Sequence, residues 1–152
     1  MDYRINKETA KRVSHGDVPW IVDVVMNTKD KIDFKKGRCD VHTHGLAELG
    51  LTELQLTIAI PIETAVYIIN SIGRLILEGN TYKEGDRLFG LFQNPEMPVG
   101  FMNATDAFKQ NVLRIILPDE LGNVSQDTAE GIYGDQCENP YIKLSRLPYP
   151  IC

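Results

Sequence analysis

Hydrophobic and polar positions alternate most clearly over residues 54–60, and the alternation predicts a β-strand. The even positions from Leu54 to Ile60 are leucine or isoleucine, whereas the odd positions are Gln55, Thr57 and Ala59. Because side chains point alternately to opposite faces of a strand, one face of this strand is expected in the core. Apolar runs predict further strands over 20–26, 38–44, 87–93, 99–104 and 110–117.

A different period begins at Pro61 and predicts one long helix that ends before Gly79. Apolar residues recur at helical spacing: Ala65, Ile68, Ile69, Ile72, Leu75 and Ile76. Proline and the acidic Glu63 both suit the first turn of a helix, and Gly79 suits its end. This Pro61–Glu78 helix is expected to anchor the core, and a weaker pattern predicts a short N-terminal helix over Asn6–Ser14.

Together these elements predict an α+β fold in a single domain of residues 1–152, with 144–152 as an extended C-terminal tail. We expect a twisted, mainly antiparallel sheet of about five to seven strands, with the long helix packed on it. A partly open barrel is the alternative. The second face of the sheet is expected to leave Phe92, Phe101 and the Leu113 side partly exposed, which favours a homodimer.

Composition excludes some classes of protein. The formal net charge is −5, which argues against nucleic-acid binding. The longest apolar segment, Val66–Leu77, is interrupted by polar residues and is too short to span a bilayer. The 3 cysteines lack close pairing, which is typical of a reducing compartment and predicts a cytoplasmic location.

The strand predicted over residues 38–44 contains the residues most suited to chemistry. Alternation places Arg38, Asp40, His42 and His44 on one face, and Cys39, Val41 and Thr43 on the other. A carboxylate and two imidazoles on one face predict a site for a zinc-like divalent metal at Asp40, His42 and His44, with Glu48 or Glu53 as a further ligand. Because Cys39 faces away from the histidines, nucleophilic catalysis by its thiol is not expected.

The same face has a second interpretation, as a polar cleft for a small anionic or polar ligand. The candidate ligand-binding residues are His42, His44, Glu48, Glu53 and Arg114. Arg114 is the one charged residue of an otherwise apolar strand, so it is expected to reach an edge of the sheet or to meet a carboxylate. The sequence contains no glycine-rich phosphate-binding motif.

An ordered set of short motifs resembles a bacterial family called domain of unknown function 4262. The set comprises His42-Thr43-His44-Gly45-Leu46, Gly50-Leu51-Thr52-Glu53-Leu54, the helix from Pro61 to Gly79, the Gly85-Asp86 turn, and Leu117-Pro118-Asp119 with Gly122. The resemblance covers residues 6–143 and implies a short N-terminal helix, a core helix and a late strand. It implies no activity, and relatives with other residues at His42 and His44 imply that a metal site would belong to a subgroup.

Three classes of function follow from these observations. The leading one is a domain that binds a small ligand or a partner at a polar cleft around residues 42–53. The second is a metal-dependent hydrolase that uses Asp40, His42 and His44. The third is a protein–protein interaction module that dimerises through its sheet.

Overall fold

The computed structural model describes residues 3, 5, 18–25, 38–106, 108–125 and 131–138. The predicted N-terminal helix over Asn6–Ser14 and the predicted extended tail over 144–152 lie outside the described residues. Among the described residues, no helix has the length and apolar character needed to cross a membrane.

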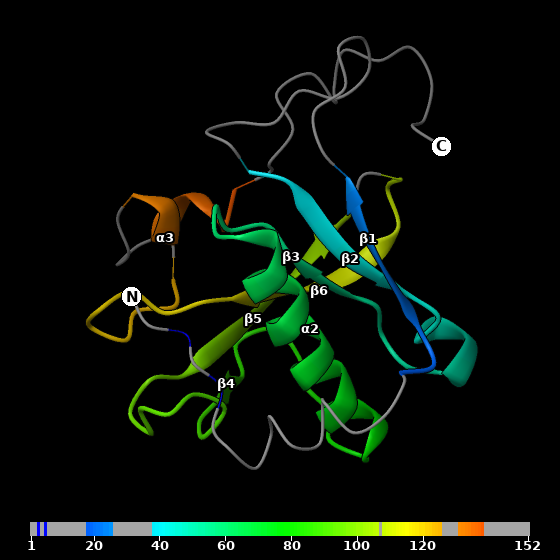
Figure 1. Cartoon of the computed structure of the whole chain (residues 1–152), viewed down its shortest axis with the longest axis horizontal. Helices are drawn as coiled ribbons and strands as arrows, with labels where there is room; N and C mark the ends of the chain where they lie inside the picture. The colour runs from blue at the N-terminus through cyan, green and yellow to red at the C-terminus, as the bar shows by residue number, and fades with distance from the viewer. Residues whose placement is uncertain are drawn as a thin grey trace, which may run out of the picture.

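The chain forms a six-stranded mixed sheet with one long helix across one face (Figure 1). The strands are β1 (Ile21–Val25), β2 (Asp40–His44), β3 (Leu54–Leu56), β4 (Arg87–Leu88), β5 (Val99–Thr105) and β6 (Asn111–Ile116). Their order across the sheet is β1-β2-β3-β6-β5-β4, and the β3–β6 pair is parallel while the other pairs are antiparallel. This arrangement confirms the predicted α+β fold. The sheet is not closed into a barrel, because β1 and β4 lie at its two opposite edges.

Two strands are shorter than their sequence patterns predict. β3 ends at Leu56 instead of Ile60, because a tight turn closed by the Ile60 amide and the Ile58 carbonyl, 2.9 Å apart, leads into the helix. β4 ends at Leu88, and Gly90 with a φ of 86° then redirects the chain. Alternating apolar residues indicate which side chains are buried, not which residues pair with a neighbouring strand. Side chains remain buried after the pairing ends, so the pattern predicts strands that are too long.

The predicted long helix is confirmed as α2 (Ile62–Leu77), and Pro61, expected in its first turn, is its N-cap. It ends where Gly79 adopts a φ of 110° and its amide donates to the Ile76 carbonyl at 3.0 Å. Its buried residues are Ala65, Ile68, Ile69, Ser71, Ile72, Gly73 and Ile76. The predicted apolar stripe is therefore the face that packs on the sheet.

Trp20 fixes the first strand against this helix. Its indole packs on Gly73, where an added Cβ would lie 2.6 Å from the ring, and its Nε1 donates to the Asn70 side-chain oxygen at 2.9 Å. Because Trp20 directly precedes β1, the contact with α2 also sets the position of that edge strand.

The apolar face of the sheet is more completely buried than the sequence suggests. Phe92, Phe101 and Leu113 are at most 4% exposed and belong to the same core cluster as the buried face of α2. The prediction that these residues remain partly exposed is wrong, because they lie on the helix-covered face. The observation that favoured a homodimer is thereby removed, and a homodimer stays an untested prediction.

The second face of the sheet has buried polar side chains at its centre, among them His42, Gln55 and Arg114, and it is partly covered by residues 131–138. This segment contains a single helical turn, α3 (Ile132–Asp135). The Gln136 side chain fixes it to the end of β6, since it accepts from the Leu117 amide at 2.8 Å and donates to the Leu117 carbonyl at 2.7 Å. A buried glutamine thus continues the hydrogen bonding of the sheet after β6 ends.

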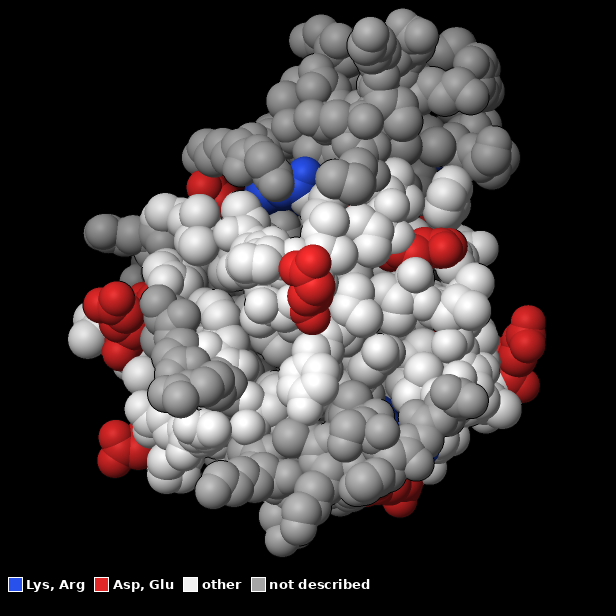
Figure 2. Space-filling model, in the orientation of Figure 1, with Lys and Arg blue, Asp and Glu red and all other residues white. Residues whose placement is uncertain are grey.

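Acidic side chains are spread over the surface on the side of α2 and do not form one patch (Figure 2). In this view no large basic patch is visible among the described residues. The expectation that the protein does not bind nucleic acid stays a prediction.

Candidate functional site

A row of polar residues crosses four strands on the second face of the sheet. The register pairs Asp23 of β1 with His42 of β2, His42 with Gln55 of β3, and Gln55 with Arg114 of β6. Residues paired across neighbouring strands share a face, so these four side chains form one line, which we call the polar row. The predicted alternation within β2 is confirmed, because Asp40 and His44 lie on this face while Val41 lies in the apolar core.

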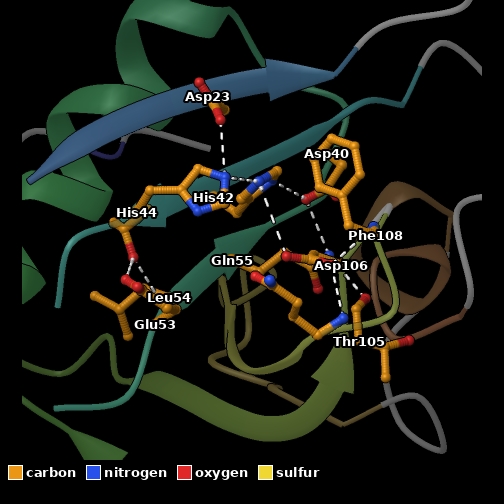
Figure 3. A network of polar contacts seen from close by, with 12 residues as sticks. Asp23, Asp40, His42, His44, Glu53, Leu54, Gln55, Thr105, Asp106 and Phe108 are labelled. Carbon is orange, nitrogen blue, oxygen red and sulfur yellow. Dashed lines mark hydrogen bonds and ion pairs between the residues drawn. The ribbon is translucent and has the colours of Figure 1, made fainter. Parts of the chain in front are cut away.

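Two imidazoles and a carboxylate converge at the β1–β2 end of the row (Figure 3). The Nε2 atoms of His42 and His44 are 3.0 Å apart, and Asp23 Oδ2 lies 2.8 Å from His44 Nε2. One ligand atom from each of the three residues lies within 4.8 Å of the others, an arrangement that could hold a metal ion. We call Asp23, His42 and His44 the His–Asp group.

The group is open to solvent on one side. The side chains of His44 and Asp23 are 32% and 44% exposed, whereas that of His42 is fully buried. The ring of Phe108 packs edge-on against His42, with ring centroids 5.9 Å apart. An ion or small ligand can therefore reach the group from the outside and meet His42 at its inner end.

Asp40 lies behind His42 rather than in the group. Its Oδ1 is 3.2 Å from His42 Nδ1, the nitrogen opposite the one that faces His44, although this contact is not aligned as a good hydrogen bond. Gln55 holds Asp40 in place by donating from Nε2 to the same oxygen at 3.0 Å. The predicted ligand set of Asp40, His42 and His44 is thus rearranged, with Asp23 in the position expected for Asp40.

The carboxylates around His42 control its protonation. Burial alone lowers the pKa of His42, but the neighbouring Asp40, then Asp106 and Asp23, outweigh burial and raise the pKa above its ordinary value. When the His42 ring is neutral and its proton is on Nδ1, facing Asp40, the lone pair is on Nε2, on the side of His44 and Asp23. This tautomer is the one that presents a ligand atom to the group.

A third carboxylate, Asp106, faces the group from the turn between β5 and β6. Its Oδ2 lies 3.9 Å from His42 Nε2, and the residue is 1% exposed. Its Oδ1 accepts hydrogen bonds from the Phe108 and Gln110 amides at 2.8 and 2.9 Å. One oxygen therefore fixes the turn, while the other is directed toward His42.

The opposite end of the polar row is sealed. Arg114 is 3% exposed, and its Nε donates to Gln55 Oε1 at 2.7 Å. Its guanidinium also donates to the main-chain carbonyls of Gln136 and Glu138 at 3.2 and 3.1 Å, and Arg38 donates to the same two carbonyls. The expectation that Arg114 reaches an edge of the sheet is wrong, because residues 136–138 cover it in the middle of the sheet. Arg114 therefore holds this segment and does not face the His–Asp group.

Glu53 has a structural role. Its carboxylate accepts from the Thr43 hydroxyl at 2.8 Å and from the amides of Gly45, Leu46 and Ala47 at 3.0, 3.1 and 3.2 Å. These bonds hold the connection that follows β2.

Glu48 is the other acidic candidate of this connection. It is exposed on the short 3-10 helix η2 (Ala47–Leu49). Neither Glu48 nor Glu53 belongs to the group of residues that could hold a metal ion.

Cys39 lies on the other face of the sheet from His42, as predicted. It is partly buried and packs against the apolar core. Burial first, and then the charge of Asp40, raise the pKa of its thiol above the ordinary value. Both effects disfavour the thiolate, so the geometry does not support nucleophilic catalysis by Cys39.

Two residues of the site are missing from the sequence-based prediction. Asp23 is a lone acidic residue in the apolar run of 20–26, and such a residue in a strand is itself a signal of a polar neighbour. Its pairing with His42 depends on the register between two strands, which the sequence pattern does not give. Asp106 lies in a turn, where an aspartate is ordinarily explained by backbone hydrogen bonds alone.

Comparisons with models of protein families, with curated proteins and with solved structures find no match to this chain. The resemblance to domain of unknown function 4262 therefore stays a prediction.

Proposed function

We propose that this protein binds one divalent transition-metal ion, of the zinc type, through Asp23, His42 and His44. The observation that carries the proposal is the approach of the two Nε2 atoms to 3.0 Å, with the Asp23 carboxylate 2.8 Å from one of them. Imidazole nitrogen and carboxylate oxygen are ordinary ligands of zinc and related metals.

The geometry favours a metal over a cleft for an organic ligand. In a ligand cleft, the two histidines are expected to diverge and to bond to separate neighbours. Here both rings direct Nε2 to one point, while Asp40 lies at the far nitrogen of His42. The second ring nitrogen of a metal-binding histidine usually donates to a carboxylate, a main-chain carbonyl or water, which fixes the tautomer and the ring orientation, and Asp40 lies 3.2 Å from that nitrogen of His42.

The number of ligands supports a catalytic site more than a structural one. Structural zinc sites usually have four protein ligands, whereas catalytic sites have three and leave a position for water or substrate. Three ligand residues with partly exposed His44 and Asp23 fit the second kind. Metal-dependent hydrolysis, in which the ion activates a bound water, is accordingly the reaction class that we propose for this site.

Metal titration of the full-length protein, purified without a histidine tag, tests the proposal. Zinc is expected to bind at one ion per chain. His44→Ala and Asp23→Asn should each weaken the binding by more than about 100-fold, because each removes a ligand. Asp40→Asn should weaken it by about 10- to 100-fold, because it changes only the partner of His42.

Glu48→Gln is the matched control, since it removes an exposed carboxylate that lies outside the His–Asp group. Its zinc affinity should equal that of the unaltered protein. Equal affinity in Asp23→Asn and the unaltered protein, or a loss in Glu48→Gln as large as in His44→Ala, would contradict the proposed ligand set.

A further inference from the structure

Negative charge surrounds the proposed metal site on more than one side. Asp23 belongs to the His–Asp group, Asp40 lies 3.2 Å from His42 Nδ1, and Asp106 lies 3.9 Å from His42 Nε2. These three carboxylates come from β1, β2 and the turn after β5. If both histidines are neutral, the three carboxylates together carry one more negative charge than a divalent cation neutralises.

Asp106 differs from the other two carboxylates in its position. It is not part of the set whose ligand atoms lie within 4.8 Å of one another, so it does not join Asp23, His42 and His44 as a fourth ligand without moving. Its Oδ1 accepts hydrogen bonds from two amides, and its Oδ2 lies on the side of His42 Nε2. A buried carboxylate oxygen fixed near an ion, but outside its ligand set, can accept a hydrogen bond from whatever the ion binds.

We propose that Asp106 determines which ligands can occupy the open position of the metal. It favours neutral ligands that donate a hydrogen bond, such as water, an alcohol or an amine, and it disfavours anions. This inference rests on the proposed metal function and deepens it, because it names the chemical class of ligand. Of the small anionic or polar ligands expected from the sequence, it selects the polar kind, as a neutral molecule that donates a hydrogen bond.

The protein contains a matched control in a second turn of the same design. In the turn 106–110 and in the turn 119–123, an aspartate Oδ1 accepts from the amides two and four residues later. The Asp119 Oδ2 accepts from the Asn123 side chain instead of facing His42. Asparagine retains the oxygen that such a turn needs, so Asp106→Asn and Asp119→Asn should both fold.

Cobalt(II) is the probe metal, because its visible absorption reports both its binding and any ligand that enters its coordination sphere. The cobalt-loaded full-length protein is titrated with azide, an anion, and with imidazole, a neutral donor. In Asp106→Asn, azide should bind about tenfold more tightly, because a negative charge close to the open position has been removed. Imidazole should bind equally well or more weakly, and Asp119→Asn should match the unaltered protein for both.

Each outcome distinguishes this inference from the proposed function. If the unaltered protein does not bind cobalt, the metal proposal itself fails. If cobalt binds but azide affinity is the same with Asp106 and with asparagine, the role of Asp106 is wrong while the metal site stands. If Asp106→Asn loses cobalt as severely as Asp23→Asn, Asp106 is a ligand, and its proposed role outside the ligand set is wrong.

Discussion

The two ends of the polar row use similar side chains in opposite ways. At the Arg114 end, residues 136–138 cover the charge, and main-chain carbonyls accept its hydrogen bonds. At the His42 end, Asp23 and His44 are partly exposed, and two imidazole nitrogens and a carboxylate oxygen lie 2.8–3.0 Å from one another along the chain Asp23–His44–His42. A buried charge that is fully hydrogen-bonded specifies the fold, whereas converging ligand atoms at the surface indicate a binding site.

Gln55 connects the two ends. Its Oε1 accepts from Arg114 at 2.7 Å, and its Nε2 donates to Asp40 at 3.0 Å, which in turn faces His42. One buried amide therefore orients a residue of the sealed end and the carboxylate behind the open end. Through this link, the sealed end helps to position Asp40 and His42, and it does not itself contact a ligand.

The largest expected effect on stability comes from the sealed end. Arg114→Leu should lower the free energy of unfolding by about 3–5 kcal/mol, because it leaves Gln55 and buried carbonyl groups without their charged partner. Urea unfolding followed by circular dichroism measures the change. A loss below about 1 kcal/mol would mean that this end contributes little to the fold.

Substitutions on the apolar face of α2 provide a reference for the loss of stability expected in Arg114→Leu. Ile69→Ala or Ile72→Ala in α2 should cost about 2–5 kcal/mol, since both residues are fully buried in the core. The same urea experiment applies. If both substitutions cost less than about 0.5 kcal/mol, α2 would not be the core element described here.

The open end should behave differently. His44→Ala should change the free energy of unfolding in the absence of metal by less than about 1 kcal/mol, because the side chain and its partner Asp23 are both partly exposed. Zinc at saturating concentration should raise the melting temperature of the unaltered protein but not that of His44→Ala. Equal stabilisation of both proteins by zinc would place the ion elsewhere.

The smallest expected effect is on the reactivity of Cys39, which lies on the other face of the sheet from His42. Because the pKa of the Cys39 thiol is raised by burial and by Asp40, iodoacetamide should alkylate it more slowly at pH 8 than a cysteine in a short peptide. Peptide mapping by mass spectrometry follows the modification at this residue. Alkylation as fast as in the peptide would show that Cys39 is more accessible and more acidic than its position indicates.

The sequence predicts those parts of the molecule that depend on local periodicity. Alternation in 38–44 correctly places His42 and His44 on one face and Cys39 on the other, and the apolar stripe after Pro61 correctly predicts α2. These features need only the repeat of a strand or of a helix.

Features that depend on how distant segments pair are not predicted. Asp23 pairs with His42 in the register of β1 on β2 and reaches the His44 ring from there, and Arg114 contacts residues 136–138, a segment that has little periodicity. The exchange of Asp40 for Asp23 in the proposed ligand set arises from the same cause. Two residues on one strand face are separated along the strand, whereas a residue on the neighbouring strand can lie closer.

The most direct test of the central claim is to locate the metal itself. A crystal of the zinc-loaded, full-length protein, measured at the zinc absorption edge, gives the position of the ion from its anomalous signal. The proposed site predicts one peak at about 2.0–2.2 Å from the Nε2 atoms of His42 and His44 and from a carboxylate oxygen of Asp23. A zinc peak bound by other residues, or zinc-saturated crystals without a peak at these three side chains, would contradict the account.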